Sequence, residues 1–320
     1  MYFLMRSKSL IPVFCYACLI ALIGLPSMAF VACKHSKNNA SKHESTLPDS
    51  NDVLYSNNLK LISELNVKIK ETSGLAVIGN NLITHNDKGR SNDLMLINPK
   101  NGNILQTIST SNFQNNDWED LAQNEDFLFI GDMGNNEGDR KNLAIYIVPI
   151  KEISKMSTSL KSIGSINFTY PEQKEFDVSK KHNFDCEAIL CFNNQIYLFT
   201  KNRLDDKTDL YVLPAKAGNY AARYIASFEV GGRITGADIS PDGKKIALLG
   251  YNKKSDCFLW TFDGFSGDNF FTGISKKYTL GQYARVGQME GIAFKDAANL
   301  YISSEEIANV FARLYLFKLD

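Results

Sequence analysis

One four-strand pattern recurs along most of this 320-residue chain. It consists of an apolar strand, a turn rich in Gly, Asn or Asp, a second strand, a polar loop, a third strand and, in most copies, a fourth. The copies begin 46 to 68 residues apart, at Ser73, Glu119, Glu187, Thr235 and Glu290. The widest spacing contains the insertion "PEQKEFDVSKKHN". Repeated four-stranded units of this length are typical of β-propellers, in which each unit forms one blade.

The last copy of the pattern has three strands before the chain ends at Asp320. The run "LKLISELNV" at 59–67 has strand character and precedes the first copy without a unit of its own. As the outer strand of the last blade, it would cover an otherwise exposed sheet edge. We therefore predict an all-β fold: a β-propeller of five four-stranded blades closed by an N-terminal strand. A six-bladed ring is the alternative, if the insertion hides a degenerate blade.

The first 33 residues are typical of an export signal. Arg6 and Lys8 form a basic start, no charged residue occurs over the 23 residues 10–32, and Cys33 follows small residues. This pattern predicts a lipoprotein signal at 1–33, in which Cys33 is acylated and becomes the new N-terminus. An uncleaved anchor helix is the alternative, since 23 apolar residues can span a bilayer. We expect an exported, membrane-tethered protein of the cell envelope, an outer-membrane lipoprotein facing the periplasm or the surface.

Composition divides the remaining chain into a disordered tether at 34–57, rich in Ser, Asn, Lys and Asp, and a propeller at 58–320. The formal net charge is zero, so we expect no nucleic-acid partner. Three cysteines remain in the body, and Cys186 and Cys191 are too far apart along one strand for a disulfide. Buried free thiols are expected.

Acidic residues concentrate where strands of different blades are expected to meet. In a propeller the first strand of each blade is innermost, and the antiparallel second strand ends where the first begins. The second strands are expected to end at Asp87, Asp132, Lys201, Tyr251 and Glu305. The starts of the five first strands and the ends of the five second strands thus form two rings of residues at one mouth. Residues expected beside these rings are Asn86, Asp117, Asp120, Asn135, Asn136, Asp185, Gln288 and Glu306. We therefore predict an acidic mouth at one end of the central channel.

Grouped carboxylates repel one another unless cations, hydrogen bonds or raised pKa values offset the repulsion. Lys201 can offset one charge, and Ca²⁺, which takes six to eight oxygen ligands, can offset more. The residues expected to contact a ligand are Asn86, Asp87, Trp118, Lys201, Tyr251 and Glu305.

Structural roles are the alternative for several of these positions. Glu119, Glu187 and Glu290 can fasten the ring by accepting hydrogen bonds from amides of the neighbouring blade. Asp132, in "GDMGNN", can shape a turn, and Trp118 can pack between blades. A triad of Ser73, His85 and Asp87 is conceivable but thinly supported, because His85 precedes Asp87 by two residues and can point elsewhere.

The segments "ETSGL", "ITHNDKG", "DWEDLA", "IGDMGNN" and "DCEAI" resemble a group of exported bacterial β-propeller proteins near the esterase-like phytase and SdiA-regulated families. The resemblance covers about 71–320. It implies an acidic mouth that is often calcium-associated; in phytases of this shape, Ca²⁺ ions bind substrate phosphates and activate water. The ligands that it implies here are Glu119, Asp120, Asp132, Asp185, Glu187 and Glu290. The chain departs from phytases in having five units rather than six and no Lys/Arg cluster beyond Lys201.

These observations favour a membrane-tethered propeller that binds a small molecule, glycan, protein or cation through its acidic mouth. A calcium-dependent, phytase-like phosphoesterase or other ester hydrolase is the second hypothesis. A purely structural envelope protein is the third.

Overall fold

The computed structural model describes residues 56–87, 89, 91–154 and 157–320. All of them belong to the compact unit Ser50–Asp320. The expected signal, its Cys33 and nearly all of the expected tether lie outside the described residues. Within the described part, no helix has the length and apolar character needed to cross a bilayer.

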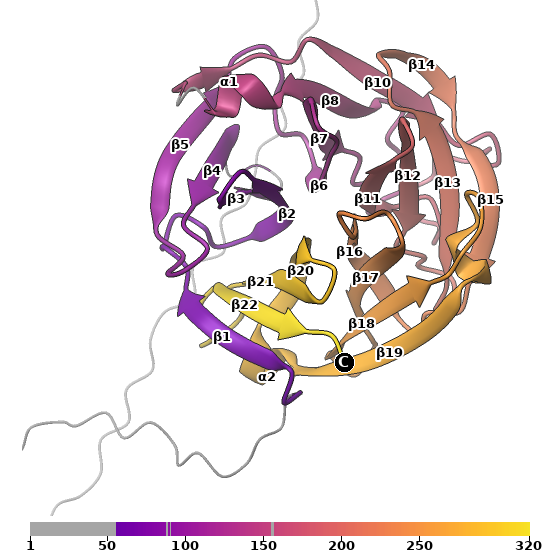
Figure 1. The fold of residues 1–320 in the computed structure, drawn as a ribbon. Coiled ribbons are helices and arrows are strands. Elements are labelled where there is room, and N and C mark those ends of the chain that lie inside the picture. Colours follow the sequence, from indigo (N-terminus) through magenta and orange to yellow (C-terminus); the bar gives the residue numbers. More distant parts are fainter. Residues whose placement is uncertain (1–55, 88, 90, 155–156) are drawn as a thin grey trace, which may run out of the picture. The chain divides into compact units, whose positions relative to one another are not determined.

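Five small sheets are arranged radially as the blades of a β-propeller, which confirms the predicted fold class (Figure 1). From the inside outward, the first blade contains β2 (Thr72–Ile78), β3 (Asn81–Asn86), β4 (Asp93–Ile97), β5 (Ile104–Thr110) and β9 (Ser159–Leu160). The second contains β6 (Trp118–Gln123), β7 (Phe127–Asp132), β8 (Leu143–Pro149), β10 (Gly164–Thr169) and β14 (Gly218–Ala221).

The third blade contains β11 (Cys186–Phe192), β12 (Gln195–Thr200), β13 (Thr208–Pro214) and β15 (Arg223–Phe228). The fourth contains β16 (Arg233–Ile239), β17 (Lys245–Tyr251), β18 (Asp256–Asp263) and β19 (Ile274–Gln282). The fifth contains β20 (Gln288–Asp296), β21 (Asn299–Glu305), β22 (Arg313–Lys318) and β1 (Leu59–Glu64). Three short helical segments connect strands: α1 (Ile150–Ser154), η1 (Phe270–Thr272) and α2 (Tyr283–Val286).

The N-terminal strand closes the ring as predicted. Strand β1 pairs antiparallel with β22, with Leu59 opposite Phe317 and Glu64 opposite Arg313. The insertion contains no strand between β10 and β11, so the six-bladed alternative does not apply. Edge pairing between the two ends of the described chain thus completes the fifth blade.

Two short strands that the repeat pattern did not predict join neighbouring blades. Strand β9, which follows the second blade's β8 in sequence, pairs in parallel with β5 of the first blade. Strand β14 leaves the third blade and pairs in parallel with β10 of the second. Both strands cover outer edges that would otherwise expose unpaired backbone groups.

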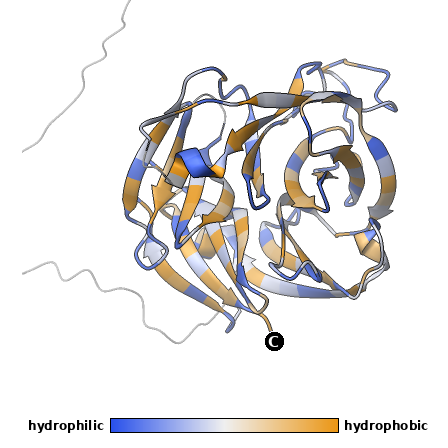
Figure 2. Ribbon diagram, turned by 45° about the horizontal axis from the view of Figure 1, so that its top comes forward, coloured by the Kyte–Doolittle hydropathy of each residue, from blue (hydrophilic) through white to orange (hydrophobic). Residues whose placement is uncertain are grey.

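The hydrophobic core lies between adjacent blades. Side chains from neighbouring sheets pack together in clusters. One cluster contains Phe199 of the third blade and Phe262 of the fourth, and the ring of Phe271 contacts both. Figure 2 shows hydrophobic residues recurring along the strands throughout the ring. Cys186, Cys191 and Cys257 are buried free thiols, as expected.

The innermost strands approach one another closely around the ring, in the order β2, β6, β11, β16, β20 and back to β2. A Cβ atom on Gly74 would lie 2.6 Å from the backbone nitrogen of Leu121, and one on Gly291 would lie 2.7 Å from the carbonyl oxygen of Ser73. Only glycine allows this spacing at these two positions. The close approach brings the starts of the five inner strands to one mouth.

Candidate functional site: the acidic mouth

A β-bulge occurs at the same repeat position in all five blades. Each inner pair of strands begins in register and shifts at once, between Thr72 and Leu75, Trp118 and Asp120, Cys186 and Ala188, Ile234 and Gly236, and Met289 and Gly291. Within these shifts lie the predicted strand starts: Ser73, Glu119, Glu187, Thr235 and Glu290. A bulge leaves one residue unpaired in the strand ladder and redirects its side chain. Each blade therefore has one such residue at the mouth.

The two hydroxyl residues at the bulges fasten the ring. Ser73 Oγ donates to the carbonyl oxygen of Glu119 (2.6 Å), and Thr235 Oγ1 donates to that of Met289 (3.0 Å). Each bond joins one blade to the next. The remaining three bulge positions carry glutamates, which therefore concentrate negative charge at the mouth.

The carboxylates of Glu119, Asp87 and Asp117 lie close together in one cluster. One oxygen from each of the three residues lies within 4.8 Å of the others. Glu119 is only 5% exposed, and its carboxylate has no hydrogen bond or ion pair with any described residue. Burial raises the pKa of Glu119 well above its ordinary value, and Glu187, Asp87 and the other nearby carboxylates raise it further. This group is the strongest candidate for cation binding.

Glu187 is paired with Lys201, whose ammonium also lies 5.5 Å from the ring centre of Tyr251. Lys201 is 7% exposed. Burial alone would lower the pKa of Lys201, but the negative charge of Glu187, followed by that of Glu290, prevails and holds it above the ordinary value. Lys201 is therefore a fixed positive charge inside an acidic ring.

Glu290 accepts a hydrogen bond from Gln288 Nε2. Burial raises the pKa of Glu290 to about 7, against the opposing effect of Lys201. Burial also raises the pKa of Glu305, and the charges of Glu290 and Asp87 add to this. The mouth therefore contains several carboxyl groups that resist ionisation at neutral pH.

Asp132 and Asp185 are saturated by protein donors. Asp132 accepts from Arg140 Nη2 (2.9 Å), Asn116 Nδ2 (2.6 Å) and the backbone of Asp117 (3.0 Å). Asp185 accepts from Arg203 Nε (3.0 Å) and from the backbone of Asn135 (2.8 Å). Asp132 therefore fits its structural alternative better than the metal-ligand role that the resemblance implies, and Asp185 is likewise held by protein donors.

Asp120 also occupies a place that does not fit the expected ligand role. Its Oδ1 accepts from the backbone of Leu121 (2.8 Å), and its Oδ2 accepts from Ile189 (2.9 Å) and Ala237 (3.2 Å). The side chain is fully buried and its oxygens serve the backbone of three blades. In the second blade, the fastening that we considered for Glu119 is thus performed by the next residue.

Two expected ligand contacts also require correction. The Trp118 side chain is fully buried, donates from Nε1 to the carbonyl of Gln114 (3.0 Å), and packs between His85 and Phe113. It therefore offers no stacking face. Both ends of the Asn86 amide are used, because it accepts from the backbone of Glu71 and donates to that of Lys68.

The conceivable triad is not assembled. Ser73 Oγ is committed to Glu119, as described above. His85 donates from Nδ1 to the carbonyl of Asn86 (3.0 Å), because a carbonyl can only accept, and Nε2 accepts from the Gly74 amide (3.3 Å). Burial lowers the pKa of His85 to about 4, so the ring is neutral and structural.

Sequence interpretation missed two cations of the site, Arg140 and Arg203. Both lie on loops that follow a second strand and fold back over the mouth. Arg203 Nη2 lies 2.6 Å from Asp185 Oδ2, and Arg140 Nη1 lies 3.9 Å from Asp117 Oδ2. For Arg140, a signal in the sequence is its place shortly after the "IGDMGNN" segment. With Lys201 included, the described acids of the mouth still outnumber the described bases.

The fold is a five-bladed β-propeller, and its candidate site is a cluster of acidic side chains that includes Asp87, Asp117 and Glu119. No family model matches the chain, and no curated protein sequence matches it. Solved structures with a similar backbone include Kuenenia stuttgartiensis hydrazine synthase, at 12% identity and a TM-score of 0.40 over 80% of this chain. A chain of the mitotic checkpoint complex is 14% identical, with a TM-score of 0.40, over 78% of this chain and 77% of that one. The chain spans 65% of the hydrazine synthase chain, and neither similarity bears on the ligand.

Proposed function

We propose that this protein is a ligand-binding propeller of the cell envelope that holds a cation, or the cationic part of a larger ligand, in its acidic mouth. The single observation that carries the proposal is Glu119. Its carboxylate is buried among other carboxylates and has no hydrogen bond or ion pair within the described residues. A buried charge in that position is costly unless it is protonated or met by a cation.

Calcium is the cation that fits best. It accepts six to eight oxygens at about 2.3–2.6 Å, so two oxygens bound to the same ion lie no more than about 5 Å apart. Glu119, Asp87 and Asp117 offer oxygens within 4.8 Å of one another. Water or a carboxylate of the bound ligand would complete the coordination.

Export and lipidation complete the proposal. The basic start, the uncharged run and Cys33 support an acylated N-terminus, which would place the propeller on a membrane with its mouth open to a small molecule, glycan or protein. The phosphoesterase hypothesis receives less support, because Lys201 and Arg203 already pair with Glu187 and Asp185. Among the described residues, a phosphate would therefore meet few available protein cations.

A calcium titration of the purified full-length protein tests the proposal. Binding to the folded state raises stability by about 2.7 kcal/mol at a hundredfold excess over Kd, so a chelator should lower the melting temperature by a few degrees. Glu119→Gln should abolish this response. In chelator it should melt at least as high as the wild type, because the amide cannot ionise and so never places a repelled charge in the group.

Glu125→Gln is the matched control. Glu125 is an exposed acid at the far end of the same hairpin, so its calcium response should equal that of the wild type. A wild type that is indifferent to chelator, or a Glu119→Gln variant that keeps the full response, would contradict calcium binding at this group. A Glu119→Gln variant less stable than the wild type in chelator would indicate a fastening role.

A further inference from the structure

A second cavity lies away from the acidic mouth, between the insertion and the third blade. It has a volume of about 640 Å³, which is in the range that accommodates small organic ligands. We call it the loop pocket. Its walls are formed by the 171–185 loop, Gly138, Leu204, and strands β13 and β15. None of the mouth carboxylates described above lines it.

The insertion is held in place over the pocket by hydrogen bonds at both of its ends. Gln173 Nε2 donates to the carbonyl of Gly138 (2.9 Å). His182 Nδ1 accepts from the Phe184 amide (3.1 Å), so its Nε2 carries the proton and donates to the carbonyl of Asn136 (3.3 Å). These hydrogen bonds fix the position of the insertion as a wall of the loop pocket.

Two tyrosine rings form a corner of the loop pocket. Tyr211 of β13 and Tyr224 of β15 lie 5.5 Å apart between ring centres, with their planes at 76°. Tyr211 is held on its other side by Tyr170, at 4.8 Å. Tyr224 is 45% exposed, so one ring is fixed and the other is accessible from solvent.

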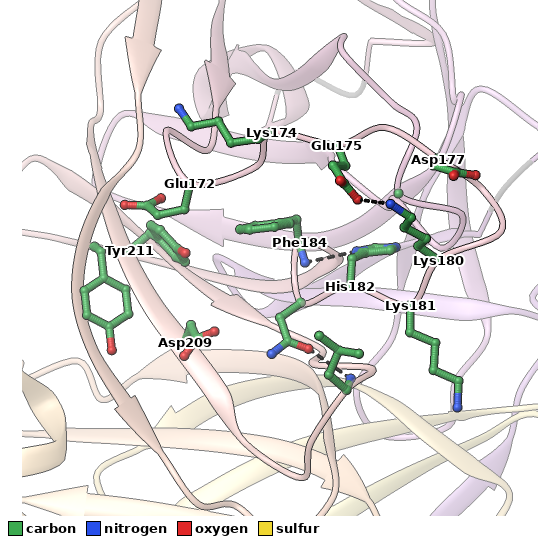
Figure 3. Close-up of a pocket in the computed structure, with 14 residues that line it drawn as sticks. Glu172, Lys174, Glu175, Asp177, Lys180, Lys181, His182, Phe184, Asp209 and Tyr211 are labelled. Atoms are coloured by element: carbon green, nitrogen blue, oxygen red, sulfur yellow. Dashed lines mark hydrogen bonds and ion pairs between the residues drawn. The ribbon is translucent and has the colours of Figure 1, made fainter.

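Two carboxylates accompany this corner. Burial raises the pKa of Tyr211, and the next causes are the charges of Glu172 and Asp209. The same two carboxylates raise the pKa of Tyr224 after burial. Figure 3 shows Glu172, Tyr211 and Asp209 on one side of the pocket, and His182, Lys180 and Lys181 on the other.

The lysines offset the negative charge at the tyrosine corner only in part, through Lys207, whose charge acts against the raised pKa values of Asp209 and Tyr224. Lys180 pairs with Glu175 across the rim, and Lys207, near Tyr224, pairs with Glu229. The side chain of Glu172 has no hydrogen bond or ion pair with any described residue. Asp209 accepts from Asn202 Nδ2 (3.1 Å), and burial raises its pKa despite the hydrogen bonds of Ser227 and Asn202 and the charge of Lys207.

Perpendicular aromatic rings with adjacent carboxylates are suited to an organic cation, because the ring faces and the carboxylates attract the same positive charge. An anion would be repelled by Glu172 and Asp209, and a purely apolar ligand would leave both carboxylates without a partner. Tyr211 is only 3% exposed and holds Tyr224 in place, so Tyr224 presents the accessible ring. We propose that the loop pocket binds an alkylammonium group, seated against Tyr224 beside the buried Tyr211 and neutralised by Glu172 and Asp209. This site is independent of the function proposed for the mouth.

Choline and its neutral isostere 3,3-dimethylbutan-1-ol provide a direct test, by calorimetric titration of the full-length protein. Choline should bind saturably and at least about tenfold more tightly than the isostere, since the two differ only in charge at the same shape. Added salt should weaken choline binding, because the carboxylates are partly exposed. A titration with a trilysine peptide, run separately, distinguishes a lysine side chain from a small free organic cation as the source of the ammonium group.

Variants locate the site. Glu172→Gln and Tyr224→Leu should each weaken choline binding by about three- to tenfold, and both positions are exposed enough that the fold should persist. Lys181→Gln, on the opposite side of the pocket, is the matched control and should bind at least as tightly as the wild type. Equal binding of choline and the isostere, no saturable binding of choline or trilysine, or loss of choline binding in Glu119→Gln but not in Glu172→Gln would overturn the proposal.

Discussion

Asp120 accepts a hydrogen bond from the backbone of Ala237, which lies 117 positions further along the chain and two blades away in the ring. The same oxygen accepts from Ile189 in the blade between them. One carboxylate therefore ties together the inner strands of three blades. Burial raises the pKa of Asp120, while the amide donors lower it.

Replacing this carboxylate should destabilise the ring. In Asp120→Asn one oxygen becomes an NH₂ group, which would face an amide that can only donate. Leaving a buried donor unsatisfied costs about 1–3 kcal/mol. We expect denaturant unfolding of this variant to show a loss of that size.

Asp126→Asn is the control, because Asp126 is an exposed acid at the outer end of the same hairpin. Its stability should match that of the wild type. If Asp120→Asn instead unfolds at the wild-type denaturant concentration but loses its calcium response, Asp120 acts as a ligand and the assignment as a fastener is wrong.

The repeat in the sequence predicted the blades, and with them the residues that reach the mouth. It succeeded because the strand and turn chemistry of each unit is local, and because Ser73, Glu119, Glu187, Thr235 and Glu290 occupy equivalent positions. The five β-bulges were not predicted, although they fall at these same positions, because no turn residue marks them. The bulges explain why the side chains leave the ladder.

The hydrogen bonds, ion pairs and strand pairings between blades could not be predicted from local sequence patterns. Glu119 and Asp120 are adjacent in sequence, yet one is a candidate ligand and the other fastens three blades. The bulge takes Glu119 out of the ladder and redirects its side chain, whereas Asp120 stays paired with Gly131. Arg140 and Arg203 lie on loops whose return path depends on the assembled ring. The parallel strands β9 and β14 depend in the same way on which edge lies nearby.

Because β1 pairs with β22, we expect stability to depend on whether an N-terminal deletion stops before β1 or removes it. Deleting residues 1–55 removes nothing from the described fold, whereas deleting 1–68 removes the outer strand of the fifth blade. The longer deletion should expose the edge of β22, lower the melting temperature and promote association. Thermal melts of the two deletion variants compare their stability, and light scattering compares their association. Equal melting temperatures would mean that the ring closes without β1.

The proposed lipid anchor is tested at Cys33. In Cys33→Ser the acylated residue is absent, so the precursor should remain uncleaved and should not incorporate a labelled fatty acid. Cys257→Ser is a control that changes a buried thiol of the body and should be processed normally. A Cys33→Ser protein of normal mature size with unchanged membrane partitioning would rule out the lipoprotein assignment.

The raised pKa values at the mouth predict that the ring loses stability as pH rises. The pKa of Glu290 is raised from 4.5 to about 7, so the folded state holds a proton that the unfolded state has released within that window. The stability that this proton provides is fully present below about pH 4.5 and is lost as pH rises through about 7. In chelator, we expect the free energy of unfolding to fall by on the order of 1–3 kcal/mol across this window.

Glu290→Gln should flatten the part of this dependence that Glu290 contributes. Asp238, whose pKa burial also raises to about 7, titrates in the same window and should leave a residual slope in the variant. Calcium should oppose the loss of stability in the wild type, because the ion favours the ionised carboxylates that a higher pH produces. The measurement is chemical denaturation at several pH values, with calcium or with chelator. A wild type whose stability in chelator rises between pH 4.5 and 7 would show that the mouth carboxylates are ionised and compensated without a cation.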